Sequence, residues 1–167
     1  EMERIYSLLG DLAGMIVDVA YPKRASQFFN LREELLRWNE ILSGSRFYKG
    51  ALKIGGVTND IDQNKLTELK DYLNYFESVF MISYEKILEN ASVLDRFETT
   101  GIIKKDLISH LNLSGPLARA SGLNKDERKD HPYCEIYREF MKSNKILEEG
   151  DVLARFRVKA GTIKNSI

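Results

Sequence analysis

A single carboxylate interrupts an otherwise apolar stretch near the start of the chain. Residues 13–21 read AGMIVDVAY, and the carboxylate is Asp18. Burial raises the pKa of a carboxyl group and suits it to proton relay, whereas a nearby arginine opposes that rise. Two interpretations stay open. Asp18 either faces water, as most charged side chains do, or it faces a larger assembly together with Asp11, with Ser7 and Gly14 leaving room for water or a partner.

A second group of charged side chains lies in a segment without clean periodicity, residues 112–133. The segment contains two Ser-Gly pairs and two prolines. Its charged residues of interest are Arg119, Asp126, Arg128 and Asp130. Charges in ordered loops tend to pair, and an Arg–carboxylate fork fixes backbone geometry. The segment is therefore either a salt-bridged surface loop or, as irregular segments of this length often are, a functional one.

The remaining reactive residue types indicate little chemistry. His110 and His131 have no carboxylate or cysteine at metal-ligand spacing, so we interpret them as surface or structural histidines. Cys134 has no convincing histidine partner, and we expect it to be a small core residue. The stretch KIGGV, residues 53–57, lacks the Lys-Ser/Thr of a phosphate loop, and its glycines predict a tight turn.

Helical periodicity dominates the elements that position these residues. The spacing of apolar residues predicts helices over 2–20 and 27–43, and Gly44 is a plausible C-terminal cap. A long helix is predicted over 61–90, with a seam for another helix made by residues at spacings of three and four. The seam residues are Leu66, Leu69, Leu73, Phe76 and Phe80.

Shorter elements are predicted elsewhere. Residues 46–57 alternate partly and predict a short strand or loop. The stretches SVLDRF and 104–111 predict short helices, 134–149 is either a helix or a hairpin, and 150–167 begins a final helix. The predicted fold class is therefore mainly α, with a single domain over 1–167. The domain is expected to be a helical bundle with a long central helix and a small β or loop segment.

Composition limits the classes of function. The 167 residues contain 25 Lys and Arg and 25 Asp and Glu, a balance that argues against nucleic-acid binding. No apolar run approaches the ~20 residues that cross a bilayer, and no signal peptide is recognisable. The one cysteine excludes an internal disulfide and indicates a reducing compartment. Since the chain opens on Glu1, directly in helical periodicity, we interpret it as a piece of a longer protein.

Two stretches carry a family resemblance. LSGPLARASGLNKDERKDHPY, residues 113–133, and GDVLARFRVKAGTIKNSI, residues 150–167, resemble motifs of one superfamily. This superfamily joins the large subunits of membrane-bound [NiFe] hydrogenases to the quinone-site subunit of respiratory NADH:quinone oxidoreductase. EMERIYSLLGDL, FFNLREELLRWNEILSGSRF and IGGV match in the same order, so the resemblance covers essentially the whole chain.

Within the superfamily, the formate-hydrogenlyase-type hydrogenases are the more similar branch. The similarity lies in VAY…FFNLREELLRWNEILSGSRFYKGALKIGGV. The quinone branch typically has Asn-His in its first helix, where this chain has Ser7 and Leu8, and Thr-Pro after it, where this chain has YPKRAS. The missing histidine argues against a quinone-type role.

The resemblance also implies what the chain lacks. The nickel-iron centre of the family is held by two Cys-x-x-Cys motifs, one on each side of the region that this chain resembles. Neither motif is present, so we expect no metal or other cofactor in this chain and no activity from it alone. The Ni-Fe centre is implied for the full-length parent only.

Particular residues correspond to family positions. Asp18 matches an acidic position linked in the quinone branch to the reaction cavity and to proton delivery, which makes it a candidate proton relay. The other matches, expected to be mainly architectural, are Glu3, Arg4, Arg119, Asp126, Arg128, Pro132, Tyr133, Gly150, Asp151 and Arg155.

The resemblance therefore predicts the central helical part of a [NiFe] hydrogenase large subunit that interconverts protons and hydrogen. It implies an iron–sulfur small subunit and membrane subunits as partners, at the inner face of the cell membrane. Two alternatives stay open: a quinone-site subunit without nickel, and a non-catalytic assembly domain.

Overall fold

A computed structural model describes residues 1–142 and 144–167. The chain divides into two compact units, residues 1–87 with 166–167 and residues 88–165, and each is described by itself. Helices make up most of the described residues and the only strands among them form one short hairpin, which confirms the predicted mainly α fold class. The expected single domain stays a prediction.

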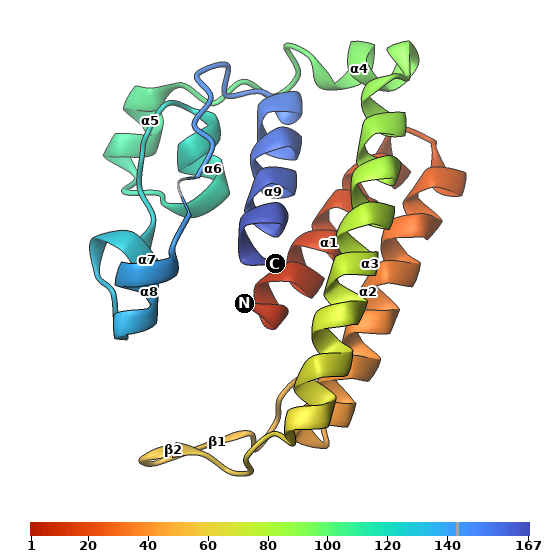
Figure 1. Cartoon of the computed structure of the whole chain (residues 1–167). Coiled ribbons are helices and arrows are strands. Elements are labelled where there is room, and N and C mark those ends of the chain that lie inside the picture. Colours follow the sequence, from red (N-terminus) through yellow and green to blue (C-terminus); the bar gives the residue numbers. More distant parts are fainter. Residues whose placement is uncertain (143) are drawn as a thin grey trace. The chain divides into compact units, whose positions relative to one another are not determined.

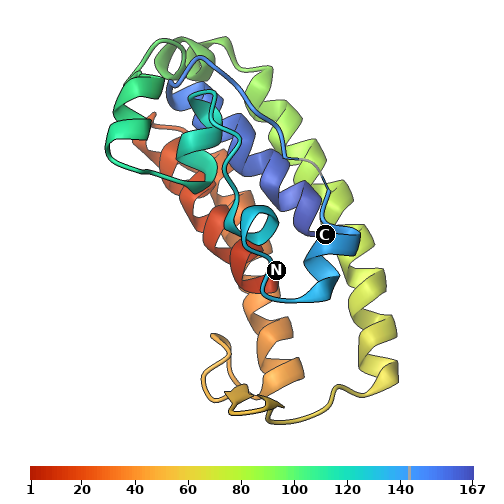
Figure 2. The ribbon, with the colours of Figure 1, turned by 90° about the vertical axis from the view of Figure 1, so that its left-hand side faces the viewer.

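The first unit begins with two paired helices (Figures 1 and 2). Helix α1 spans Met2–Asp18 and α2 spans Pro22–Ser43, and the two contact each other along their length. Helix α2 begins five residues before the predicted start. Pro22 occupies its first turn, where a proline costs no hydrogen bond. Gly44 ends α2 with a φ of 77°, as expected of a C-terminal cap.

A β-hairpin joins α2 to the long helix α3. Strand β1, Leu52–Lys53, pairs antiparallel with β2, Gly56–Val57, and Leu52 lies opposite Val57. The φ of Gly55 is 92°, a conformation that favours glycine, so the tight turn predicted from KIGGV is confirmed. In both ribbon views the hairpin lies beyond the ends of α2 and α3 (Figures 1 and 2).

Helix α3, Gln63–Leu88, runs antiparallel to α2. Two aromatic pairs show the direction: Phe28 packs against Phe80 at 5.8 Å between ring centroids, and Trp38 against Tyr72 at 5.5 Å. Phe76 and Phe80 of the predicted seam are fully buried, whereas Leu66 is 37% exposed. The seam is therefore a core contact in its second half only.

The second unit contains six helices among the described residues. They are α4 Ala91–Phe97, α5 Lys105–His110, α6 Gly115–Ala120, α7 Glu127–Asp130, α8 Glu135–Phe140 and α9 Val152–Ser166. Helices α6 and α7 lie in the segment expected to be irregular. Of the two predictions for 134–149, a helix or a hairpin, the structure has a helix that ends at Phe140, and 141, 142 and 144–149 form no further helix or strand.

Helix α9 supplies much of the apolar packing of this unit. Phe97 meets Phe156 with ring centroids 5.4 Å apart, and Ala120, Ala154 and Val158 form a buried cluster against which Leu147 packs. Burial of such side chains is the main favourable contribution to folding, roughly 25 cal/mol per Å² of apolar surface. Within the described part of the chain, no helix combines the length and apolarity that a bilayer crossing requires.

Candidate functional site

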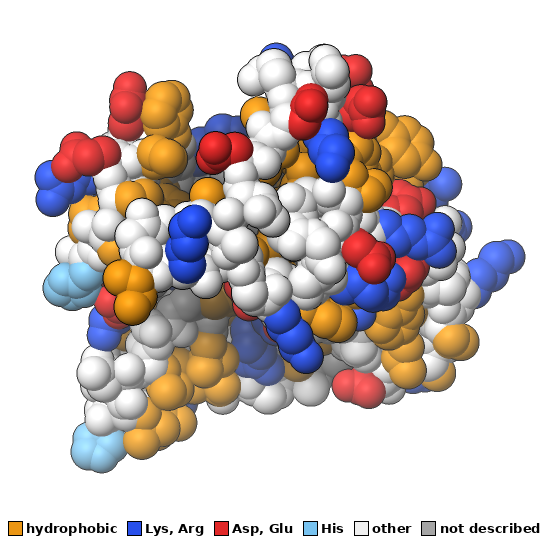
Figure 3. All heavy atoms as spheres, turned by 90° about the horizontal axis from the view of Figure 1, so that it is seen from below, with side chains coloured by type: hydrophobic (Ala, Val, Ile, Leu, Met, Phe, Trp, Pro, Cys, Tyr) orange, Lys and Arg blue, Asp and Glu red, His pale blue; other side chains and the backbone are white. Residues whose placement is uncertain are grey.

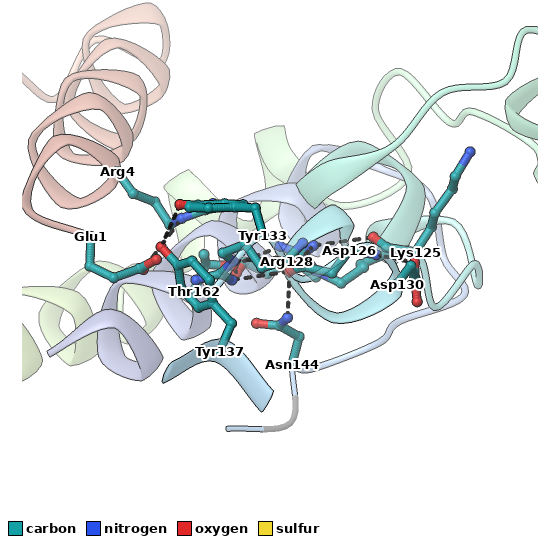
Figure 4. Close-up of polar contacts among 12 residues, drawn as sticks. Glu1, Arg4, Lys125, Asp126, Arg128, Asp130, Tyr133, Tyr137, Asn144 and Thr162 are labelled. Atoms are coloured by element: carbon teal, nitrogen blue, oxygen red, sulfur yellow. Dashed lines mark hydrogen bonds and ion pairs between the residues drawn. The ribbon is translucent and has the colours of Figure 1, made fainter. Parts of the chain in front are cut away.

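Asp126 is the centre of a buried polar cluster (Figure 4). It is the residue before α7, and its Oδ1 accepts a hydrogen bond of 3.1 Å from the Arg128 backbone N–H, which caps that helix. The Arg128 guanidinium forms a fork on the same carboxylate, with Nε 3.1 Å from Oδ1 and Nη2 3.0 Å from Oδ2. Asn144 donates a third side-chain bond, 2.7 Å long, to Oδ2.

Arg119 brings two more elements to this carboxylate. It lies on α6 and is fully buried, and its Nη1 donates to Asp126 Oδ2 at 3.0 Å. Its Nη2 donates to Thr162 Oγ1 of α9, also at 3.0 Å. One guanidinium therefore connects α6, the start of α7 and α9, since its planar fork can serve several acceptors at fixed angles.

The electrostatics of the cluster favour an ionised carboxylate. Burial acts to raise the pKa of Asp126, but the hydrogen bonds and charge of Arg128 and the charge of Arg119 lower it below its ordinary value of 3.8. The backbone N–H of Asp126 in turn donates to Asp130 Oδ2 at 2.9 Å. All four charged residues singled out in this segment are thus brought together.

Asp151 forms a second polar junction, at the start of α9. Its Oδ1 accepts from the Ala154 N–H at 2.8 Å and caps the helix, while its Oδ2 accepts from the Thr99 N–H at 2.9 Å. Arg155 donates from Nη1 to the carbonyl of Gly101 at 3.0 Å and to that of Gly150 at 2.7 Å. These contacts hold the turn after α4 against the first turn of α9.

Backbone contacts complete this junction. The Ile103 N–H donates to the Gly150 carbonyl at 2.9 Å, and the Gly150 N–H donates to the Ala120 carbonyl at 2.8 Å. Gly150 has a φ of 65°, and a side chain there would clash with the Ile103 carbonyl oxygen. Only glycine fits this position without rearrangement.

The remaining predicted site residues lie on α1, in the first unit, and in the segment before α8. Asp18 is exposed at the last residue of α1, and Asp11 is exposed two turns earlier on the same helix. Glu3 and Arg4 occupy the first turn of α1, where Arg4 Nε lies 3.4 Å from Glu1 Oε2. Tyr133 is 78% exposed, and its hydroxyl donates to that of Tyr137 at 3.0 Å.

Two expectations are corrected. The charged segment is not a salt-bridged surface loop, because Arg119, Asp126 and Arg128 are at most 6% exposed. Their charges are buried because each has hydrogen-bonding partners within the cluster. Cys134 is exposed rather than a core residue, since it precedes α8, a short helix without any buried residue.

Sequence alone does not identify the uncharged side chains and backbone groups that hydrogen-bond to the charged residues of the two clusters. Asn144, Thr162 and Thr99 each bond a predicted site residue. Only their hydrogen-bonding capacity is visible in the sequence, because the tertiary fold alone brings them near their partners. Thr162 could have been suspected, since a polar residue on the buried side of the last helix needs a hydrogen-bonding partner.

The donor set of the described residues does not fit a nickel-iron centre. No three His, Cys, Asp or Glu side chains come together as a metal site anywhere in 1–142 or 144–167. The one cysteine is exposed and has no second thiolate beside it. The contacts that the structure gives for the two clusters are hydrogen bonds and ion pairs between elements of the second unit.

One protein family and several curated proteins match this chain. The family described as "Respiratory-chain NADH dehydrogenase, 49 Kd subunit" matches residues 19–167. The chain is 34% identical over its whole length to a chloroplast NAD(P)H-quinone oxidoreductase subunit of Cicer arietinum, and 32% identical to an NADH-quinone oxidoreductase subunit of Ehrlichia ruminantium. It covers 42% of the length of the Cicer arietinum relative.

A solved structure agrees with this. The chain matches part of the membrane-bound sulfane sulfur reductase, an archaeal respiratory membrane complex, with a TM-score of 0.90 and 27% identity over 98% of this chain and 44% of the other. The resemblance found in the sequence is thereby confirmed at the level of the superfamily. The chain belongs to the family of the 49 kDa subunit of respiratory-chain NADH dehydrogenase.

Proposed function

We propose that this chain is the central helical part of an oxidoreductase large subunit that works in a multisubunit respiratory membrane complex. The observation that carries the proposal is the family match over residues 19–167, together with the high structural similarity to one chain of a respiratory membrane complex. In this role the Asp126 and Asp151 clusters keep the second unit rigid. Reacting groups supplied elsewhere in the parent protein then stay in place, because small displacements cost much catalytic rate.

The first candidate for the chemistry is hydrogenase-type proton and hydrogen interconversion at a Ni-Fe centre. It is supported by the formate-hydrogenlyase-type sequence pattern and by Leu8, which occupies a position where quinone-type relatives carry histidine. Leu8 is buried on the core side of α1, so this position offers an apolar side chain and no hydrogen-bonding group. The metal ligands would come from segments other than this chain, and electrons would arrive through an iron–sulfur small subunit.

The second candidate is quinone reduction without nickel. The names of the curated relatives support it, since both the chloroplast and the bacterial protein are quinone oxidoreductase subunits. Under either candidate the parent lies at the inner face of the membrane through partner subunits. Asp18 is the proposed proton-relay carboxylate, placed at the end of α1 where an additional subunit could cover it.

One experiment separates the two candidates. The parent complex is purified in detergent, its nickel is quantified, and it is assayed for hydrogen evolution from a reduced viologen and for reduction of a short-chain quinone. Stoichiometric nickel with hydrogen evolution supports the first candidate, and quinone reduction without nickel supports the second. A parent protein that purifies without other subunits contradicts the proposal as a whole.

A further inference from the structure

The β1–β2 hairpin is closed by hydrogen bonds of its own. Its two strands pair antiparallel, and at its base the Thr58 N–H donates to the Ala51 carbonyl at 2.8 Å. The Thr58 hydroxyl also donates to the Gly50 carbonyl at 2.6 Å. Among residues 50–58, here called the hairpin arm, no residue is buried and all except Ala51 are exposed. The arm can therefore change direction as one body, because the bonds that close it lie within it.

The segment that leads into the arm, residues 44–49, is attached to both helices before it. Asn39 of α2 is fully buried, and its Nδ2 donates to the Arg46 carbonyl at 2.9 Å. Phe47 packs edge-on against Tyr6 of α1, with ring centroids 6.0 Å apart. The direction of the arm is therefore set immediately before the arm begins.

The Arg46 side chain adds a charged attachment to α2. Its Nη1 donates to Glu33 Oε1 at 3.0 Å and its Nη2 to Glu33 Oε2 at 2.6 Å, a planar fork of defined geometry. The hydrogen bonds from Arg46, opposed by desolvation and assisted by Arg37, lower the pKa of Glu33 to about 2. Glu33 is therefore ionised at neutral pH, and protonation is not what would release Arg46.

Glu33 also has a second cation in contact. Arg37 lies one turn later on α2, its Nε donates to the same Oε1 at 3.2 Å, and its side chain is 69% exposed. The hydrogen bond to Glu33, followed by the charges of Glu33 and Glu40, raises the pKa of Arg46. Both members of the fork therefore have another opposite charge nearby. Charged side chains are open to solvent at the end where Figure 1 shows the hairpin (Figure 3).

We propose that Glu33, Arg37 and Arg46 form a latch that gives the hairpin arm a held and a released state. The arm is held when Arg46 forks on Glu33, and it is released when Arg37 keeps the carboxylate alone. Opening costs little, because an exposed ion pair is weak and water solvates the freed guanidinium. The bond from Asn39 and the contact of Phe47 remain, so the arm is redirected rather than detached. The inference concerns the arm and holds for either candidate chemistry.

The latch predicts opposite effects for the two arginines. If the three charges only held the segment together, removal of either arginine would loosen the arm. In the latch Arg37 competes with Arg46, because it shares one oxygen with it and its charge offsets the carboxylate that Arg46 faces. Arg46→Gln should therefore favour the released state, and Arg37→Gln should favour the held state.

Distances between two nitroxide labels in the parent protein measure the released fraction. The labels replace Ile54, a fully exposed residue between the two strands, and Asn74, an exposed residue of α3. Both are attached through non-natural amino acids, so that cysteines stay unlabelled. Pulsed electron double resonance should give one distance for the held arm and other distances for the released arm. Arg46→Gln should raise the released fraction about two- to fivefold, as expected for loss of an exposed ion pair.

Lys49→Gln is the matched control, since it removes an exposed positive charge from the same segment and should leave the distances unchanged. Added salt should raise the released fraction of the wild type but not that of Arg46→Gln, because salt screens exposed ion pairs. Wild-type distances that are the same at every salt concentration would overturn the inference. So would wild-type distances in Arg46→Gln, or a released fraction in Arg37→Gln that is unchanged or higher. Melting temperatures equal to the wild type verify that the variants are folded.

Discussion

Arg119 Nη2 donates a hydrogen bond of 3.0 Å to Thr162 Oγ1, and the two residues are 43 positions apart in the sequence. The same guanidinium also bonds Asp126, so two helices and a loop depend on one side chain. Burying a guanidinium is expensive unless its charge is paired and its N–H groups have acceptors. The cluster therefore stabilises one arrangement of these elements and penalises any other in which Arg119 loses its acceptors.

Replacing this arginine should destabilise the chain strongly. Arg119→Ala leaves the Asp126 carboxylate buried with one cation fewer and leaves a cavity behind, so the free energy of unfolding should fall by about 3–5 kcal/mol. Urea denaturation followed by circular dichroism measures the change. The matched control is Arg138→Ala, because Arg138 pairs with Glu135 at 3.6 Å while both side chains are largely exposed. This control should change the free energy of unfolding by less than about 1 kcal/mol. Equal losses in the two variants would show that the buried Arg119 contributes no more stability than an exposed arginine.

Acid should weaken the same cluster. The Asp126 pKa is lowered in the folded state, so the folded protein binds this proton less readily than the unfolded chain does. The resulting stabilisation is fully present above about pH 4, the ordinary pKa of an aspartate, and is lost as the pH falls through the lower folded value. The stability difference between wild type and Asp126→Asn should therefore be largest near neutral pH and shrink below about pH 4. A difference that stays constant with pH would show that the carboxylate is not ionised in the fold.

The junction at the start of α9 depends on one glycine. Gly150→Ala places a Cβ against the Ile103 carbonyl oxygen at a φ of 65°, so a loss of at least about 2 kcal/mol in the free energy of unfolding is expected. Gly14→Ala is the control, since a Cβ there meets nothing within 4 Å and Gly14 lies inside α1. This control should be neutral or stabilise by up to about 1 kcal/mol. Thermal denaturation of the two variants gives the comparison.

Asp18 gives a prediction about activity rather than stability. In the full-length parent, Asp18→Asn should lower turnover about tenfold or more while the complex assembles normally, because an amide cannot accept and release the relayed proton. Asp71→Asn, at an exposed position of α3, is the control and should leave turnover unchanged. Unchanged turnover in Asp18→Asn, measured on complex of verified composition, would remove this residue from the relay.

Periodicity accounts for what can be predicted of the fold. Helices α1, α2 and α3 are long and amphipathic, and their apolar spacing is visible without knowledge of their neighbours. The predicted start of α2 is wrong because Pro22, a residue type that often ends a helix, here occupies the first turn of the next one. Helices α6 and α7 escape prediction because they are short and lie in the segment 112–133, where the Ser-Gly pairs and prolines indicate irregular backbone and α6 itself begins with Gly-Pro.

The candidate site is predictable in its charged members only. Arg119, Asp126 and Arg128 stand out by their types and by the resemblance, and the structure brings them together. Their burial does not follow from the sequence, because whether a charge can be buried depends on partners such as Thr162 and Asn144 that are distant along the chain. For Cys134 the average preference of cysteine for the interior is misleading, since a short exposed helix follows it.

The long-range contacts at Gly150 and Asp151 also have a consequence for the order of events during synthesis. The turn at residues 99–103 finds its hydrogen-bond acceptors and donors only about fifty positions later, on residues 150–152. A nascent chain can therefore pair α1 with α2 soon after both leave the ribosome, but it cannot close the second unit until residues 150–152 have emerged as well. During that interval Phe97 has no Phe156 to cover it, and the growing polypeptide is most exposed to chaperones and proteases.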